Sequence, residues 1–220
     1  MVKTGELLGD RRRLKMLMAL VDGQSWPAGD LARYAKIQPA TASYHLELLV
    51  SGGLLAVIPQ GRHRYYRLTS PAVADLLEHL AAVAKPTTAR SLRGVQDKEA
   101  LSYGRTCYSH LAGQLGVAWR QCWIDEGHVL PADNGLILTE SGRRQLALLD
   151  LEAKAQTVIL QHSVDWTQRV PHFAGPLAKA ATDRLLVLGW IARGPIPRAI
   201  YVTQQGEIEL PKFGIPILSP

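Results

Sequence analysis

The chain has 220 residues, of which 47% are hydrophobic and 20% are charged, with a formal net charge of +6 at pH 7. This length is enough for more than one domain with a modest core. No apolar run approaches the roughly eighteen residues of a membrane span, and the first residues lack the apolar stretch of a secretory signal. Two cysteines, Cys107 and Cys122, provide no disulfide framework. We therefore expect a cytoplasmic protein with no membrane partner.

The positive charge is concentrated in the first part of the chain. Residues 1–85 contain 11 Lys and Arg against 7 Asp and Glu, whereas residues 86–220 contain 14 against 12. A basic excess in one segment is what phosphate binding requires. The charge alone is weak support, but it falls on the same residues as the motif described next.

Three helices are expected at the start of the chain. Apolar residues recur at helical spacing over 11–22, 31–35 and 41–49, and the last two segments are separated by a tight turn. Gly52 and Gly53 end the third helix, because glycine adopts left-handed conformations without steric cost. This arrangement is typical of a helix-turn-helix.

A basic hairpin follows these helices. The runs 54–58 and 62–68 flank Pro59-Gln60-Gly61, which predicts two strands joined by a turn with basic residues at its tip. Another helix is expected over 72–84. The order of elements predicts a winged helix-turn-helix domain over residues 1–85.

The second helix of such a motif enters the major groove of DNA, and its outward polar side chains contact base edges. The basic residues of the hairpin are placed for phosphates or for the minor groove. The alternative is that Tyr44 and His45 merely pack and that the arginines are solvated. The predicted DNA contacts are Lys36, Gln38, Thr41, Ser43, Tyr44, His45, Arg62, His63, Arg64 and Arg67.

Three segments of this domain, 41–46, 53–55 and 61–68, resemble the ArsR/SmtB-like family of winged-helix regulators. The resemblance implies a homodimer that reads a palindromic operator near its own promoter, with the helices around 11–22 and 71–84 at the dimer contact. In the metal-sensing members a cysteine-bearing helix would fall at residues 28–35, where this chain has no cysteine. Their second site would use Asp75, Glu78 and His79, so metal sensing is not carried over.

The second half contains an internal repeat. Residues 110–118 match 172–180 at an offset of 62, and the later parts of the two copies match at an offset of 64. Each copy has the pattern of a degenerate winged helix. We predict a linker at 86–98 and a regulatory domain at 99–220, with copies at about 105–150 and 167–212. The predicted fold class is mainly α with small β-hairpins, an α+β protein.

This half resembles a long subgroup of the same family through segments 105–113 and 165–175. Cys107 precedes a predicted helix, where backbone N–H groups lower a thiol pKa, or it is a small packing residue. His110 and His172 are equivalent in the repeat and either converge on a ligand or anchor the two copies. The candidate sensing residues are Cys107, His110, His162, Asp165, Trp166 and His172.

These residues lack the short-range spacing of a metal site. We therefore predict no metal and no cofactor, with a metal ion or haem iron as the alternative. No catalytic motif is present in the sequence, so an enzyme is not expected. We predict a dimeric transcriptional repressor that binds double-stranded DNA and senses a small-molecule effector or a redox signal. The alternative is an architectural DNA-binding protein whose repeat serves oligomerisation.

Overall fold

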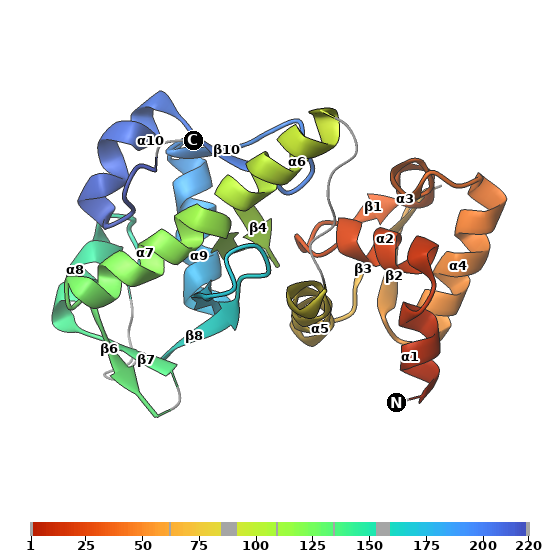
Figure 1. Cartoon of the computed structure of the whole chain (residues 1–220), viewed down its shortest axis with the longest axis horizontal. Coiled ribbons are helices and arrows are strands. Elements are labelled where there is room, and N and C mark those ends of the chain that lie inside the picture. The colour runs from red at the N-terminus through yellow and green to blue at the C-terminus, as the bar shows by residue number, and fades with distance from the viewer. Residues whose placement is uncertain are drawn as a thin grey trace. The chain divides into compact units, whose positions relative to one another are not determined.

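The computed structural model describes residues 2–61, 63–84, 92–108, 110–133, 135–152 and 159–218. The chain divides into two compact units, Met1–Leu77 and Glu78–Pro220. Both consist of helices with small antiparallel sheets (Figure 1), which confirms the predicted fold class. Across the described ranges no helix is both long and apolar enough to cross a membrane.

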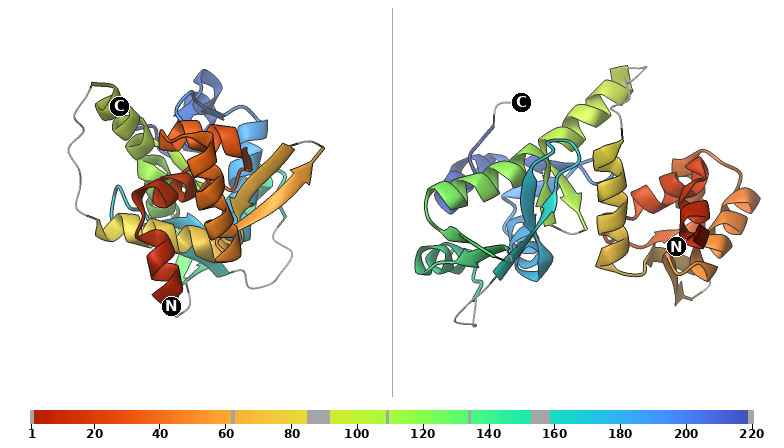
Figure 2. Two further views of the ribbon diagram at one scale, coloured as in Figure 1. Left: turned by 90° about the vertical axis from the view of Figure 1, so that its right-hand side faces the viewer. Right: turned by 60° about the horizontal axis from the view of Figure 1, so that its bottom comes forward.

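The first unit is a winged helix-turn-helix. Its helices are α1 (Val2–Leu8), α2 (Arg11–Ala19), α3 (Ala28–Ala35), α4 (Pro39–Ser51) and the first part of α5 (Pro71–Val83). Its strands are β1 (Trp26–Pro27), β2 (Leu55–Gln60) and β3 (His63–Leu68), in the order β1-β3-β2. Figure 2 shows the β2–β3 hairpin extending away from the helices. Pro59 is accommodated because β2 is an edge strand of this sheet.

The apolar faces predicted from periodicity form the core of this unit. Leu17, Leu31, Leu46 and Leu49 are buried. Asp10 is the N-cap of α2, because its carboxylate accepts hydrogen bonds from the backbone N–H groups of residues 12 and 13. Burial of these leucines and capping of the helix explain why the sequence adopts this arrangement.

The second unit combines five helices with three small sheets among the described residues. Its helices are α6 (Leu92–Tyr103), α7 (Gly113–Asp125), α8 (Glu140–Ala147), α9 (Gly175–Val187) and α10 (Gln204–Glu209), followed by the 3-10 helix η1 (Pro211–Phe213). Its strands are β4 (Arg105–Cys107), β5 (His110–Ala112), β6 (Val129–Ala132), β7 (Gly135–Leu138), β8 (Ile159–Val164), β9 (Pro171–Ala174), β10 (Ile191–Arg193) and β11 (Ile200–Val202). The sheets are β4-β5, β6-β7-β8-β9 and β10-β11.

An aromatic cluster occupies the centre of the second unit. Trp119 and Trp123 of α7 contact each other and Phe173, with ring centroids 5.0–5.7 Å apart in edge-on arrangements. The indole N–H of Trp123 donates to the carbonyl oxygen of Phe213 at 2.8 Å. Buried aromatic rings of this size contribute much of the packing free energy of a small domain. This cluster links α7, β9 and the end of the chain.

The predicted linker at 86–98 differs from the structure in its second half. Residues up to 91 lie outside the described ranges, whereas residues from Leu92 onward belong to α6. Tyr103 at the end of α6 packs against the core of the second unit. Tertiary packing of one end explains why a polar segment without clear periodicity forms a helix. The division at 1–85 and 99–220 remains a prediction.

Matching local structures occur at equivalent positions of the predicted repeat. Gly113 and Gly175 begin α7 and α9 with φ values of 78° and 83°. Thr139 and Thr203 are the N-caps of α8 and α10, and each accepts a hydrogen bond from the backbone N–H three residues later. These pairs agree with the offsets of 62 and 64. The tandem repeat as a whole remains a prediction.

Two glycines in these helices test the packing. A Cβ atom at Gly206 would lie 1.8 Å from the carbonyl oxygen of Trp190, and one at Gly142 would lie 2.2 Å from that of His128. We expect Gly206→Ala and Gly142→Ala each to lower the free energy of unfolding by about 1–3 kcal/mol, measured by urea denaturation. Gly29→Ala is the control, because its Cβ would approach no atom closer than 3.9 Å. Equal stability of all three variants would contradict this packing.

Candidate nucleic-acid interface and buried polar cluster

The turn of the helix-turn-helix is set by Lys36. This residue ends α3 in the left-handed conformation with φ of 58°, and the backbone N–H of Ile37 donates to the carbonyl oxygen of Ala32 at 3.0 Å. Such a C-terminal cap stops a helix and redirects the chain. Gln38 is the N-cap residue of α4 and makes no side-chain cap hydrogen bond, and Pro39 occupies the first turn. Proline is tolerated there because a backbone N–H at that position would have no partner within the helix.

Most predicted contacts on α4 are accessible. Lys36, Gln38 and Ser43 are exposed, Tyr44 is 60% exposed, and Thr41 is half-buried. The hydroxyl of Ser43 donates to the carbonyl oxygen four residues earlier, at 3.1 Å, which leaves its oxygen free to accept. These side chains therefore form a polar face at the start of α4.

A basic hollow lies beside this face. Its volume is about 440 Å³ and its lining includes Lys36, Gln38 and Thr41 together with Arg12 and Arg33. The two arginines were not predicted from the sequence. Arg33 is an exposed neighbour of Asp30, with which it forms an ion pair. A hollow with this composition suits an anionic oxygen, such as that of a phosphate.

His45 is not on the exposed face, and its predicted role is wrong in this respect. Its side chain is 5% exposed, and it lies on the same stripe as Ala42, Leu46 and Leu49. Residues three and four apart share a helix face. His45 follows Ala42 by three residues, so it lies on the buried face with Ala42. The prediction failed because a polar residue was assumed to be exposed.

The β2–β3 hairpin, which is the wing of the motif, carries several exposed basic side chains. His63, Arg64 and Arg67 on β3 are exposed, whereas Tyr66 and Leu68 of the same strand are buried. Successive side chains of a strand point to opposite faces, which places Arg67 on the outer side. Arg62, the remaining predicted contact, lies outside the described residues.

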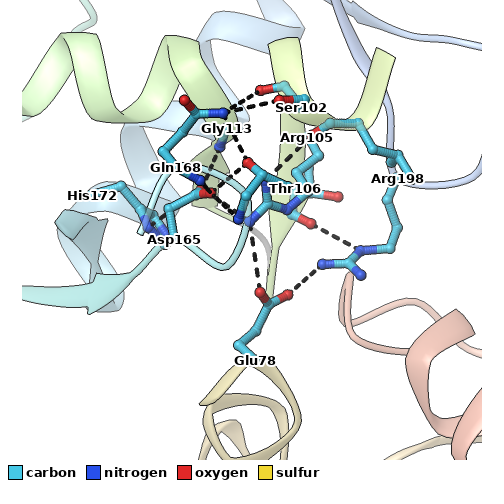
Figure 3. Close-up of polar contacts among 11 residues, drawn as sticks. Glu78, Ser102, Arg105, Thr106, Gly113, Asp165, Gln168, His172 and Arg198 are labelled. Atoms are coloured by element: carbon cyan, nitrogen blue, oxygen red, sulfur yellow. Dashed lines mark hydrogen bonds and ion pairs between the residues drawn. The ribbon is translucent and has the colours of Figure 1, made fainter. Parts of the chain in front are cut away.

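A buried ion pair forms the centre of a second candidate site. Arg105 of β4 and Asp165, which follows β8, are both fully buried, and their Nη2 and Oδ2 atoms lie 2.9 Å apart. The same guanidinium donates to the hydroxyl of Thr167 at 3.1 Å and lies 4.9 Å from the centroid of the Trp166 ring. Figure 3 shows Arg105 and Asp165 pointing toward each other.

Asp165 accepts hydrogen bonds from several backbone groups. Its Oδ1 atom accepts from the N–H groups of Thr167 and Gln168, and its Oδ2 atom accepts from that of Gly113 at 2.6 Å. Burial alone would raise the pKa of this carboxyl, but Arg105 and the hydrogen bonds outweigh burial and lower it to about 2. Asp165 is therefore a carboxylate at neutral pH.

Glu78 extends the cluster. This residue of α5 is fully buried, and its two carboxylate oxygens face the guanidinium groups of Arg198 and Arg105. The Nε atom of Arg198 also donates to the carbonyl oxygen of Thr106 at 3.1 Å. Figure 3 shows Glu78 between the two arginines. Glu78 thus compensates Arg198 and, together with Asp165, Arg105.

Three predicted sensing residues come together beside this cluster. Cys107, His110 and His172 are buried, and one ligand atom from each lies within 4.8 Å of the others. The two imidazole centroids are 5.2 Å apart, which leaves no space between them for a ring-sized ligand. Thiolate and imidazole are ligands of soft and borderline metal ions, so these residues could hold one.

The pKa values of these groups are all displaced by burial. Burial, with help from His172 and Arg105, lowers the pKa of His110 to about 3. Burial also lowers the pKa of His172 to about 4, although Asp165 opposes it. Burial and Glu78 raise the pKa of Cys107 well above its usual value. Both imidazoles are therefore neutral at neutral pH, and the sulfur is a thiol.

The expectation that a helix terminus lowers the pKa of Cys107 is therefore wrong. Cys107 lies on β4, several residues before α7 begins at Gly113, and its environment is buried. His162 also stands apart, because it is exposed on β8 in register with Phe173. Trp166 is half-buried beside Arg105.

A separate hollow lies elsewhere in the second unit. It has a volume of about 690 Å³, and its lining includes Tyr103, Tyr201, Glu99 and Glu207. Burial and Glu207 raise the pKa of Tyr103. None of the predicted sensing residues contributes to this hollow, which is large enough for a small organic molecule.

Sequence reasoning named Asp165 but missed the two cations of the cluster, Arg105 and Arg198. Two signals point to them in retrospect. Arg105 and Thr167 are separated by the repeat offset of 62, as are His110 and His172, and each pair is in contact. A glutamate among the leucines of α5 is the second signal, because a buried charge requires a partner.

Comparisons with known proteins agree with the winged helix-turn-helix. Residues 8–58 match the helix-turn-helix domain family HTH_20. Over 214 residues the chain is 37% identical to the HTH-type transcriptional regulator YdfF of Bacillus subtilis, which covers 96% of this chain and 95% of that protein. The HTH-type transcriptional regulator CmtR of Mycobacterium tuberculosis is 32% identical over 83 residues, covering 38% of this chain and 70% of the relative.

Among solved structures, the homodimeric winged helix-turn-helix DNA-binding domain of a protein from Mycobacterium bovis, described as a possible ArsR-family transcriptional regulator, is 30% identical. That match covers 37% of this chain and 75% of the other, with a TM-score of 0.35.

The winged helix and its relatives define a class of DNA-binding proteins rather than enzymes. This chain belongs to the family of HTH-type transcriptional regulators. The resemblance to ArsR/SmtB-like regulators predicted from the sequence is confirmed.

Glu78→Gln tests the buried cluster. Removing this carboxylate leaves Arg198 and Arg105 with less compensation in a buried setting, and breaking such a pair costs about 3–5 kcal/mol. We expect a loss of free energy of unfolding of this size in urea denaturation. Glu140→Gln is the matched control, because its contact with Arg143 is at the surface and such pairs contribute less than about 1 kcal/mol. Equal losses in the two variants would contradict the assignment.

Proposed function

We propose that this transcriptional regulator is a dimeric, sequence-specific repressor that acts in the cytoplasm on a palindromic operator near its own promoter. The second unit senses a small ligand and changes the affinity of the first for DNA. The observation that carries the DNA-binding part is the exposed face of α4 together with the exposed basic residues of β3.

The two exposed groups have different tasks on DNA. Gln38 presents an amide, which pairs with the edge of adenine, and the methyl group of Thr41 suits the methyl group of thymine. Lys36, Arg64 and Arg67 carry positive charge at exposed positions and neutralise phosphates. Base contacts from α4 therefore determine which DNA sequence is recognised, whereas the basic side chains determine the affinity for DNA and its dependence on salt.

Helix α5 supports the proposed dimer. Leu76, Leu80 and Val83 are 39%, 39% and 81% exposed, and their spacing of four and three residues places them on one helix face. An exposed apolar stripe of this kind suits a protein contact, and the ArsR/SmtB-like resemblance assigns that contact to a second copy. The other proposed contact helix, α2, contributes Met16 and Leu17 to the core instead.

The second unit suits a ligand better than an oxidant as its signal. The thiol of Cys107 is buried and its pKa is raised, and a thiol in that state reacts slowly. The unit contains both the buried polar cluster and the hollow near Tyr103. Glu78 of the cluster belongs to α5, the helix that also carries the proposed dimer residues. A ligand that rearranges the cluster would shift the population of dimer geometries.

Binding to the DNA upstream of the protein's own gene tests the proposal. We expect specific binding that weakens with salt, and we expect Arg64→Ala to weaken binding to every sequence and reduce the salt slope by about one. Gln38→Ala should instead cost about 1–3 kcal/mol of discrimination at one base position. The measurement is fluorescence anisotropy over a salt series, with scrambled DNA as the competitor.

Arg193→Ala is the charge-matched control, since Arg193 is an exposed arginine of the second unit. It should leave both the affinity and the salt slope unchanged. Equal affinity for scrambled and upstream DNA at every salt concentration would contradict the repressor and favour the architectural alternative.

The dimer is tested by placing charge on the exposed stripe of α5. We expect the double variant Leu80→Glu with Val83→Glu to be monomeric in sedimentation velocity, because two carboxylates cannot be buried without partners. Operator affinity should fall with it, because a monomer contacts one half-site. Leu130→Glu, at a residue 53% exposed on β6, should remain dimeric. A double variant that stays dimeric would place the interface elsewhere.

A further inference from the structure

We propose that Cys107, His110 and His172 bind one soft monovalent metal ion of the Cu⁺ class, through the thiolate sulfur and one nitrogen of each imidazole. The sequence favoured no metal site because these residues lack short-range spacing, but the fold brings their ligand atoms within 4.8 Å of one another. The claim that this ion is the signal sensed by the second unit rests on the proposed function. The claim that the three residues bind the ion does not.

The backbone places the three residues with precision. Cys107 and His110 face each other across the last register pair of the β4–β5 hairpin. His172 lies on β9, which packs against β5 and α7. Three side chains held by strands of one folded unit form a more rigid site than three on loops.

The imidazoles lack the hydrogen bonds that buried rings normally make. Among the described residues, no hydrogen-bond partner is found for either ring nitrogen of His172 or for the Nδ1 atom of His110. Both side chains are at least nine-tenths buried. An unsatisfied buried polar group costs about 1–3 kcal/mol, and a missing ion is one of its recognised explanations. A metal ion would use these lone pairs.

A metal ligand must offer a lone pair, and the unpartnered ring nitrogens of His110 and His172 can each supply one. The Oδ2 atom of Asp165 lies 4.0 Å from the Nδ1 atom of His172, which is beyond hydrogen-bond distance. The carboxylate therefore adds negative charge beside the site without occupying a ring nitrogen.

The spacing of the ligand atoms requires a small adjustment. With metal–sulfur and metal–nitrogen distances of about 2.3 and 2.0 Å, sulfur and nitrogen ligands lie about 3.5–3.8 Å apart. The observed upper limit of 4.8 Å is therefore about 1 Å too long. Binding of the ion therefore requires the side chains of Cys107 and the two histidines to rotate toward one another.

Charge balance selects a monovalent ion. Four buried charged side chains interact with the site and sum to zero, namely Arg105, Arg198, Glu78 and Asp165. When the ion binds, the thiol of Cys107 releases its proton to solvent and the sulfur–metal bond forms, with no electron transferred. A monovalent ion and the thiolate then sum to zero, whereas a divalent ion leaves one uncompensated positive charge. Buried uncompensated charge is costly, and Arg120 nearby adds to that cost.

Ligand type agrees with this selection. A thiolate with two imidazoles suits Cu⁺ and Zn²⁺, and the charge balance decides between them. Ag⁺ is the redox-stable probe of the same charge and softness.

The test is equilibrium dialysis of the reduced full-length protein against Ag⁺ or Zn²⁺ in a competing thiol buffer without oxygen. We expect one tightly bound Ag⁺ per chain in the natural protein and in Cys122→Ser, which removes the other cysteine. Cys107→Ser should bind Ag⁺ more than roughly 100-fold more weakly, beyond the 10–100-fold typical of residues behind the ligands. Unchanged binding by Cys107→Ser, or tighter binding of Zn²⁺ than of Ag⁺, would overturn the proposal.

A second measurement on the natural protein covers the case in which Cys107→Ser does not fold. With ¹⁵N-labelled histidine, Ag⁺ should shift the ring resonances of two of the seven histidines, and an absence of shifts would overturn the site. Operator affinity measured with and without Ag⁺ separates the two proposals. An unchanged affinity with bound ion would reject the ion as the signal, whereas failure to bind the operator at all would reject the repressor and leave the ion site in place.

Discussion

The second unit depends on the contact between the guanidinium of Arg105 and the carboxylate of Asp165. Both groups are fully buried and lie 2.9 Å apart. Burying either charge without the other would cost several kcal/mol. Because Asp165 also accepts from the backbone of Gly113, the pair connects strand β4, the loop after β8 and the start of α7. A small domain thus uses one ion pair to set the position of three elements.

That constraint explains the unusual state of the neighbouring groups. Burial, with a smaller effect of Arg105, lowers the pKa of both His110 and His172, and Asp165, the partner of Arg105, lies 4.0 Å from the second of these rings. The positive charge of Arg105 is shared with Glu78, which also binds Arg198. The outcome is a pocket of balanced charge next to two neutral imidazoles and a thiol. In the first unit, by contrast, the predicted contact residues Lys36, Arg64 and Arg67 are exposed.

The sequence predicted the first unit well because its signals are local. Helical periodicity, the glycines after α4 and the basic hairpin each involve neighbours in the chain, and the winged helix followed from their order. His45 was misplaced because its polarity was given more weight than its spacing from Ala42. The wing residue Arg62 and the predicted linker up to residue 91 lie outside what the structure describes.

The second unit was harder to predict because its decisive contacts are distant in sequence. Arg105 and Asp165 are 60 residues apart, and Arg198 and Glu78 are 120 apart. Composition and periodicity carry no information about such pairs. The repeat did bring His110 and His172 together as equivalent positions, but only the fold shows that Cys107 joins them. The sequence therefore named three residues that the fold brings together, but it did not predict their arrangement.

A double-mutant cycle on Arg105 and Asp165 tests the central claim most directly. Free energies of unfolding would be measured for Arg105→Met, Asp165→Asn and the double variant. Each single change should cost about 3–5 kcal/mol, because it removes the nearest opposite charge from a buried ionised group. The double variant should cost far less than the sum, since neither charge remains. Additive losses would show that the two groups do not depend on each other and would contradict this account of the second unit.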